Sequence, residues 1–253
     1  MNQVLRKIAA KVLLMPKVKQ EFKKIQAFYD MQVQDGDTDW LDIEESFTEG
    51  DAKALEKLVR MVRRENVMIV EIGSWKGFST SILARSVVDC HGSVFAVDHW
   101  RGNEGTWNYD VTKDSNIYSI FKRNMISLGL GDIVHPLVMD SQTASQIFSD
   151  GILDLVFIDA DHTYEPFKKD IFAWLPKLRD GGILCGHDCE GYYSEYSEEV
   201  KKKIEEHLGD DYISGICHPG VVKALHEYFQ DRYSIMPNSV VWYYIKKDTS
   251  STC

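Results

Sequence analysis

The chain has few of the features that mark disulfide-rich, zinc-ribbon or nucleic-acid-binding proteins. Only five of its 253 residues are cysteine, and none of them form a C-x-x-C pair, so we expect neither a disulfide framework nor a zinc ribbon. The formal net charge of -10 argues against general binding to nucleic-acid phosphates. Internal repeats and low-complexity segments are absent. We therefore expect a small-molecule partner, no nucleic acid and a reducing, cytoplasmic location.

Long apolar runs are also missing. The stretch 1–31 comes nearest, but Lys11 and Pro16 interrupt it and it lacks a small-residue cleavage site, so we expect neither a transmembrane segment nor a signal peptide. Basic residues dominate this stretch, which predicts an amphipathic helical arm. Such an arm can cap an active site, join copies of the chain into a homo-oligomer, contact a membrane surface, or pack on the domain with a solvated basic face.

Composition and length predict one sizeable α/β domain behind this arm. The chain is 44% hydrophobic and 27% charged, which is typical of a folded protein with a substantial core. A helix is expected at 48–64. We place the boundary after it, so that residues 1–64 form the N-terminal arm and cap and residues 65–253 form the main domain.

Apolar runs and helical segments alternate along the main domain. Strands are expected at 67–70, 93–97, 133–139, 153–158 and 183–185, and helices at 115–128, 164–178 and 220–229. Two further strands, at 233–236 and 240–245, flank a Pro-Asn turn that predicts a hairpin. The pattern predicts a Rossmann-like three-layer α/β sandwich with a mostly parallel seven-stranded sheet and an antiparallel C-terminal hairpin.

The first strand of this domain runs into a turn that contains glycine. Glu71 ends the strand, Gly73 and Gly77 allow a left-handed backbone or a close approach to a ligand, and Ser79 can satisfy a free N–H group in the next helix. Ligands of α/β sheets bind beyond the carboxyl ends of the strands. A nucleotide-like site and an ordinary strand–helix turn both fit these residues.

The next two strands also end in polar residues. Asp98 is placed to accept both hydroxyls of a ribose, with His99 beside it, although a loop or capping aspartate fits equally. Asp140, Ser141 and Gln142 can hydrogen-bond an adenine edge, cap the following helix, or do both. This edge of the sheet therefore carries candidates for each part of a nucleoside.

Acidic and imidazole groups follow two later strands. Asp159 and His162 follow one of them, and His187 and Asp188 follow the next. In a parallel sheet these strand ends converge on one rim. Tyrosines in the following stretch 191–208 either wall an acceptor pocket as a lid or anchor an amphipathic helix to the domain.

Taken in order, four segments resemble class I S-adenosylmethionine-dependent methyltransferases, specifically the small-molecule O-methyltransferase-like group with the IDADHxY signature. These segments are VEIGSWKGFST, VFAVDHW, LDLVFIDADHTYEPFKKDIFAWLPKLRDGGILCGHD and HPGVVKALHEYF. The resemblance covers roughly residues 65–247 and departs from the usual glycine motif at Trp75, which occupies the middle glycine position. It implies S-adenosylmethionine as cofactor and methyl transfer to a hydroxyl of a small-molecule acceptor.

The resemblance also implies roles for single residues. Glu71 and Gly73 are expected at the amino-acid end of the cofactor, and Asp98 at its ribose. Ser141 and Gln142 are expected near the adenine. The full set of expected cofactor-binding residues is Glu71, Gly73, Ser74, Trp75, Gly77, Ser79, Asp98, His99, Asp140, Ser141, Gln142 and Asp159.

Metal and base positions follow from the catechol-type members of the same group. Asp159 matches their cation-binding aspartate, and His187 and Asp188 match an Asp-Asn pair, so a divalent cation such as Mg²⁺ is expected there. The histidine is a departure, because Mg²⁺ prefers oxygen ligands. His162 occupies the position of a catalytic lysine and is the first candidate base, with His187 second. A helix-capping role for His162 is the alternative.

Two other functions remain open from the sequence. A nicotinamide-dependent oxidoreductase would also explain the turn and the acidic ribose residue, although Trp75 in the middle glycine position and the C-terminal hairpin disfavour it. A noncatalytic cofactor-binding protein is the other alternative. In such a protein the Asp159 and Asp188 rim would be structural.

Overall fold

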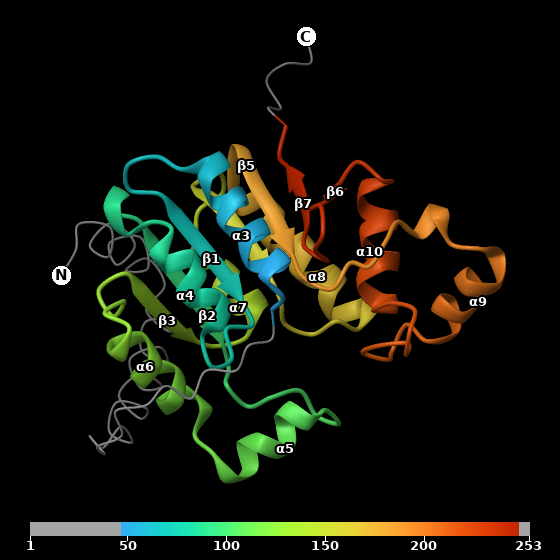
Figure 1. Ribbon diagram of the computed structural model, residues 1–253, viewed down its shortest axis with the longest axis horizontal. Coiled ribbons are helices and arrows are strands. Elements are labelled where there is room, and N and C mark those ends of the chain that lie inside the picture. Colours follow the sequence, from blue (N-terminus) through green and yellow to red (C-terminus); the bar gives the residue numbers. More distant parts are fainter. Residues whose placement is uncertain (1–46, 248–253) are drawn as a thin grey trace.

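The computed structural model describes residues 47–247 (Figure 1). The N-terminal arm expected before residue 47, with its predicted capping, homo-oligomer and membrane-surface roles, lies outside the described residues. None of the described helices is long and apolar enough to span a membrane.

The described residues form one seven-stranded sheet with the order β3-β2-β1-β4-β5-β7-β6 (Figure 1). Its strands are β1 Met68–Ile72, β2 Ser93–Asp98, β3 Val134–Val138, β4 Leu153–Ile158, β5 Leu178–Gly186, β6 Ser234–Ile235 and β7 Trp242–Ile245. The first five are parallel, whereas β7 is antiparallel to both β5 and β6. This confirms the predicted mostly parallel sheet with its antiparallel C-terminal hairpin.

Helices cover both faces of the sheet. They are α3 Glu49–Val62, α4 Phe78–Arg85, α5 Trp107–Asp114, α6 Ile117–Ser127, α7 Ser141–Ser145, α8 Tyr164–Trp174, α9 Glu198–Glu206 and α10 Pro219–Phe229, with 3-10 turns η1 Val88–Cys90, η2 Leu175–Lys177 and η3 Tyr193–Glu195. One core packs α3, α4 and α6 against the sheet, with Leu55 and Phe121 buried in it. The second core packs α8 and α10 around residues such as Trp174 and Leu225. The two cores give the three-layer sandwich.

Helix α3, which the sequence places in the N-terminal arm, packs on the main domain. Thr48 caps it, and the Asp51 carboxylate accepts a hydrogen bond from the Thr48 N–H at 2.9 Å. A second oxygen of Asp51 accepts from the N–H of Val240, at 3.0 Å. Asp51 thereby ties α3 to the C-terminal part of the chain.

The strand order places a crevice at the end of β1. This strand pairs with β2 on one side and β4 on the other. After β3, at one edge of the sheet, the chain therefore returns past β2 and β1 to add β4 on the opposite side of β1. Ile72, Val97 and Ile158 lie in register at the carboxyl ends of these three strands. Doubly wound sheets bind ligands at such a switch point.

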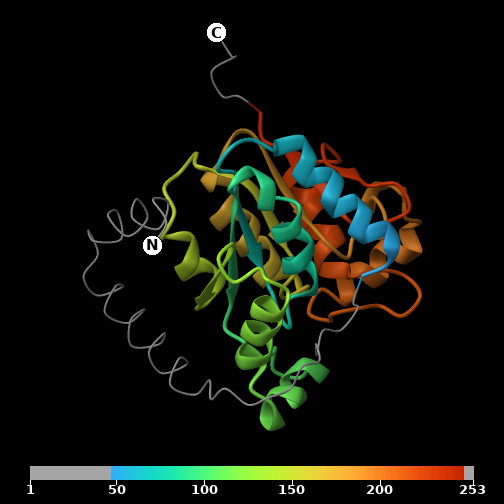
Figure 2. The ribbon, with the colours of Figure 1, turned by 60° about the vertical axis from the view of Figure 1, so that its left-hand side comes forward.

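Two elements differ from the expectation. Residues 101–114, a polar stretch where no helix was predicted, include α5, which has no buried residue and therefore leaves no apolar periodicity to detect. It projects from the lower side of the molecule in both ribbon views (Figure 1 and Figure 2). Strand β5 begins at Leu178 rather than at the predicted residue 183, so Gly181 and Gly182 lie inside the strand. A Cβ on Gly182 would lie 2.9 Å from the Arg179 carbonyl, so glycine accommodates an irregularity in the strand.

The tyrosines after β5 anchor rather than line the site. Tyr192, Tyr193 and Tyr196 pack against the second core, and the Tyr193 hydroxyl donates to Glu205 on α9 at 2.7 Å. They do not line the two cavities described below. Of the two interpretations of this stretch, the structure therefore favours the anchor.

Candidate active site

The loop after β1 is held in a glycine-like conformation. A Cβ on Gly73 (φ 85°) would lie 2.0 Å from the Asp159 carbonyl oxygen, so glycine is required where this loop touches the end of β4. Trp75 also adopts a left-handed backbone (φ 43°). Its N–H donates to Oδ2 of Asp98 at 2.9 Å, and its carbonyl accepts from the indole of Trp100 at 2.7 Å. The tryptophan in the middle glycine position thus keeps the backbone that glycine would favour.

Glu71 lies beneath this loop. Its side chain is fully buried and accepts hydrogen bonds from the hydroxyls of Ser79 and Thr80 at the start of α4. Burial raises the pKa of Glu71 to about 7, although these hydrogen bonds oppose the rise. In this conformation Glu71 positions the helix start, and its direct contact with a cofactor stays a prediction.

A first cavity, of about 210 Å³, lies beyond the ends of β1 and β2. Predicted cofactor residues line it: Gly73, Trp75, Asp98, His99, Asp140, Ser141, Gln142 and Asp159. Asp98 presents a carboxylate whose oxygens accept from Trp75 and, at 2.6 Å, from the N–H of Trp100. Asp140 also caps α7 by accepting from the Thr143 N–H at 2.9 Å. Asp140 therefore caps the helix as predicted and also lines the cavity, whereas the hydrogen bond to an adenine edge stays a prediction.

A second cavity, of about 240 Å³, adjoins the first. Six further members of the predicted set line it, namely Ser74, Gly77, Ser79, His162, His187 and Asp188. Trp107 of α5 also reaches it, and its ring meets Trp75 edge to face at 5.7 Å. Asp159 lines both cavities. The two cavities thus meet at the end of β4.

Carboxylates surround both candidate bases. Nε2 of His162 lies 3.0 Å from Asp188 and 3.5 Å from Asp159. His187 places its ring nitrogens 3.0 Å from Asp188 and 3.5 Å from Asp51, and it stacks on Phe47 at 4.4 Å. The sequence predicted this convergence of two strand ends on one rim.

The carboxylates outweigh burial in setting the charge of these rings. Burial alone would lower the pKa of His187, but Asp188, Asp51 and Asp159 raise the pKa to about 10. The pKa of His162 is likewise raised well above its ordinary value, because Asp159, Asp211 and Asp188 overcome its burial. Without another cation nearby, both imidazoles hold their protons at neutral pH.

The expected magnesium ligands come together but suit magnesium poorly. Asp159, His187 and Asp188 offer ligand atoms that all lie within 4.8 Å of one another. Each nitrogen of His187, however, already faces a carboxylate, and Mg²⁺ favours an all-oxygen, octahedral shell. The residues therefore do not fit the metal that the resemblance implies.

Four polar residues in and around the two cavities were not predicted from the sequence. Asp170 on α8 accepts hydrogen bonds from Ser141 and Gln142, and its burial raises its pKa to about 7. Asp211 pairs with His162, His218 lies 3.6 Å from Asp188, and Glu190 pairs with His218. The HPG start of the α10 segment was a signal for His218, but the other three follow no strand end directly and offer no motif.

His162 does not cap helix α8, which was the alternative role predicted for it. Asp161 accepts from the N–H and the hydroxyl of Thr163, the residue that precedes α8, at 2.9 and 2.6 Å. His162 instead bonds Asp211, with Nδ1 2.8 Å from its carboxylate. The ring therefore belongs to the rim rather than to the helix cap.

Comparisons with known proteins agree with this arrangement. Residues 70–189 match a family model described as a methyltransferase domain. An uncharacterized protein from Sinorhizobium fredii is 27% identical over 124 residues, which are 48% of this chain and 13% of that much longer protein.

Solved structures share the fold at low sequence identity. A SAM-dependent O-methyltransferase from Thermotoga maritima is 17% identical with a TM-score of 0.50, over 81% of this chain and 68% of that chain. A protein from Corynebacterium glutamicum is 11% identical with a TM-score of 0.54, over 97% and 98% of the two chains. Residues 70–189 are therefore similar to a methyltransferase domain, and the chain shares the fold of these solved structures.

Proposed function

We propose that this protein transfers the methyl group of S-adenosylmethionine to a hydroxyl of a small-molecule acceptor. The observation that carries the proposal is the meeting of two cavities at Asp159. One has polar groups suited to a nucleoside, and the other contains a cluster of carboxylates and imidazoles. A methyl donor in the first cavity and an acceptor in the second would meet at this shared wall.

The first cavity suits the nucleoside part of the cofactor. Each carboxylate oxygen of Asp98 accepts one backbone N–H, which leaves it a second lone pair for a ribose hydroxyl. Ser141 and Gln142, held by Asp170, present polar groups at the far side of the cavity. The methionine part would extend past Gly73 toward Ser74 and Ser79 in the second cavity.

Methyl transfer then depends mainly on alignment of the acceptor oxygen with the methyl group and the sulfonium. The hydroxyl must also lose its proton as it attacks. His162 and His187 are the bases predicted from the sequence, but the surrounding carboxylates keep both rings protonated. Asp159, which lies on the shared wall, is therefore the proton acceptor that we favour, with the imidazoles orienting the hydroxyl.

Calorimetry with S-adenosylmethionine and with NADH is the first test. We expect the former to bind and the latter not to bind, and the opposite result would support the oxidoreductase alternative. A screen of phenolic, sugar, polyketide and lipid-linked acceptors with an isotopically labelled methyl donor then identifies the product. The chemical shift of the labelled methyl group separates an O-methyl from an N-methyl product.

Variants of the rim test the roles of its residues. Asp159→Asn should bind S-adenosylmethionine and lose turnover, whereas Asp150→Asn, an exposed aspartate paired with Lys177, should match the wild type. If His162→Gln abolished turnover and Asp159→Asn did not, with cofactor binding intact in both, the result would identify His162 as the base. Full turnover in both rim variants would favour a noncatalytic role for the rim.

A further inference from the structure

We infer that His162, Asp188 and His218 form a binding site for a divalent transition-metal ion such as Zn²⁺ or Mn²⁺. Ligand atoms of these three residues lie within 4.8 Å of one another. The site shares Asp188 with the expected magnesium set but replaces its other two members. It adjoins the proposed methyl-transfer cavity, yet metal binding there does not require that the proposed function be correct.

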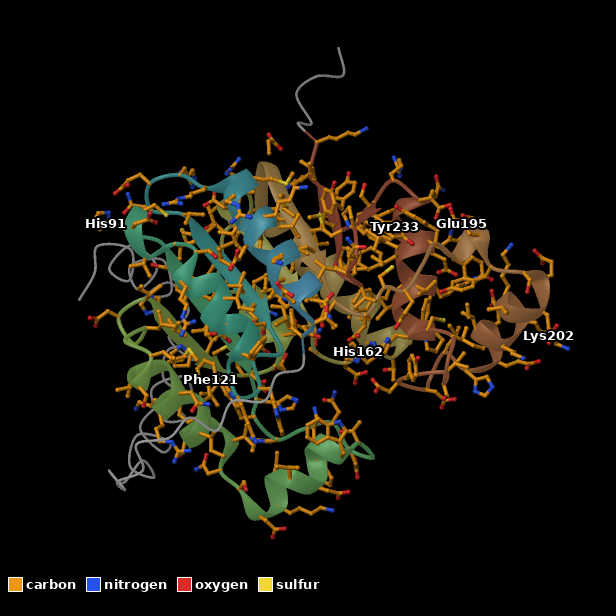
Figure 3. All side chains as sticks on the ribbon, in the orientation of Figure 1. His91, Phe121, His162, Glu195, Lys202 and Tyr233 are labelled. Carbon is orange, nitrogen blue, oxygen red and sulfur yellow. The ribbon has the colours of Figure 1, made fainter. Side chains whose placement is uncertain are left out.

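Three separate segments bring these ligands together. His162 follows β4, Asp188 follows β5, and His218 immediately precedes α10. The start of α10 can approach closely because Gly220 has no side chain, and a Cβ there would meet the His162 carbonyl. Figure 3 labels His162 in this region, between the sheet and the helices of the C-terminal part. The rings of His162 and His218 meet edge to face at 5.0 Å.

A second carboxylate also pairs with each of the two imidazoles. Nδ1 of His162 is 2.8 Å from Asp211, so its Nε2 is the nitrogen that faces Asp188. Nδ1 of His218 is 2.6 Å from Glu190 and 3.6 Å from Asp188, and Glu190 also accepts the backbone N–H of His218 at 3.1 Å. Metal-binding histidines commonly carry such a carboxylate partner, which fixes the ring orientation and raises the basicity of the ligand nitrogen.

The facing nitrogen of His162 supplies an independent observation. It is buried and lies 3.0 Å from Asp188, yet it makes no hydrogen bond of acceptable geometry within residues 47–247. A buried imidazole nitrogen rarely stays unsatisfied. This arrangement is expected when a nitrogen and a carboxylate oxygen both face an ion rather than each other.

The donor set selects the class of metal. Two imidazoles and one carboxylate are typical ligands of Zn²⁺ and of other first-row divalent ions with open positions for water or substrate. Mg²⁺ prefers oxygen and fits this set poorly. The competing interpretation is a metal-free network in which protonated imidazoles pair with Asp188, Glu190 and Asp211.

Titration with Co²⁺ separates these interpretations without cofactor or acceptor. The full chain is stripped with a chelator, and Co²⁺ binding is followed by its visible absorption and by equilibrium dialysis, with Zn²⁺ and Mg²⁺ as competitors. We expect one Co²⁺ per chain, displaced by Zn²⁺ but not by millimolar Mg²⁺. Because no methyl donor is present, the result is independent of whether methyl transfer is ever detected.

Matched variants locate the ion. His218→Gln should weaken Co²⁺ binding at least about tenfold, and Glu190→Gln, which removes only the supporting charge, should weaken it by about tenfold. His207→Gln is the control, because His207 is an exposed histidine similarly paired with a carboxylate, Asp210. His218 makes no side-chain cap to α10, and circular dichroism with urea unfolding checks that each variant folds.

Three results would overturn the inference. They are absence of Co²⁺ binding to the wild type, unchanged affinity in both His218→Gln and Glu190→Gln, and a larger loss in Asp159→Asn than in His218→Gln. The first two favour the metal-free network. The third would place the ion on Asp159, His187 and Asp188.

Discussion

A Cβ on Gly220 would lie 2.3 Å from the carbonyl oxygen of His162, so backbone touches backbone where α10 meets the loop after β4. Gly220 has no unusual backbone angle, and its lack of a side chain alone permits this approach. The contact fixes the start of α10 beside the rim. It therefore connects the C-terminal third of the chain with the candidate active site.

Gly220→Ala should force α10 away from this loop. The added methyl group would meet backbone atoms of His162 and Tyr164, which cannot rotate aside, and overpacking of this kind costs about 1 to 3 kcal/mol. Urea unfolding measures the loss. Gly209→Ala is the control, because a Cβ there meets no atom of the described residues within 4 Å. Equal stability of the two variants would contradict the close contact.

Asp98→Ala should weaken binding of S-adenosylmethionine by at least about tenfold, which corresponds to about 1.4 kcal/mol. The change removes the acceptor that holds the N–H groups of Trp75 and Trp100, together with the proposed ribose contact. Calorimetry measures the dissociation constant, and exposed Asp150→Ala serves as the control. Unchanged affinity with a folded variant would remove Asp98 from the cofactor site.

Asp170→Asn should make stability less dependent on pH. Burial raises the Asp170 pKa to about 7 in the folded protein, against about 3.9 when unfolded. The folded state therefore binds a proton between these values that the unfolded chain does not, so this group lowers stability as pH rises through that window. The amide keeps an oxygen that can accept from Ser141 and Gln142.

Urea unfolding at pH 5 and pH 8 checks this prediction. From pH 5 to pH 8 the wild type should lose about 1 to 3 kcal/mol more than Asp170→Asn. Glu71, whose pKa is also raised to about 7, acts in the same direction in both proteins and cancels in the comparison. Parallel pH dependence of the two proteins would show that Asp170 titrates normally.

Trp107→Ala should affect the acceptor and not the fold. The indole is 60% exposed, although it lines the second cavity beside Trp75. Loss of an exposed side chain changes stability by about 0.5 kcal/mol or less, and the cofactor dissociation constant should stay unchanged. With an identified acceptor, KM should rise several-fold.

Phe172→Ala provides the matched control for this tryptophan. Phe172 is similarly exposed but packs on Tyr228, and it lines neither cavity. Its KM for the acceptor should match that of the wild type. Equal KM values in the two variants would exclude Trp107 from acceptor binding.

The sequence by itself determined the order of strands and helices and most of the polar residues at the strand ends. Buried parallel strands are continuous apolar runs, so β1, β2 and β4 were predictable from the order of apolar residues along the chain. Because parallel strands end at one edge, the meeting of Asp159 with Asp188 followed directly from the order of the elements.

Only the tertiary structure decided which groups surround that rim. Asp51 on α3, His218 before α10 and Asp211 after α9 come from segments far apart in the sequence, and no local periodicity encodes their contacts with His187, Asp188 and His162. Asp51 and Asp211 help to keep His187 and His162 protonated, whereas a general base must be neutral. Their approach depends on packing between backbones, as at Gly220, which a pattern of residue types does not specify.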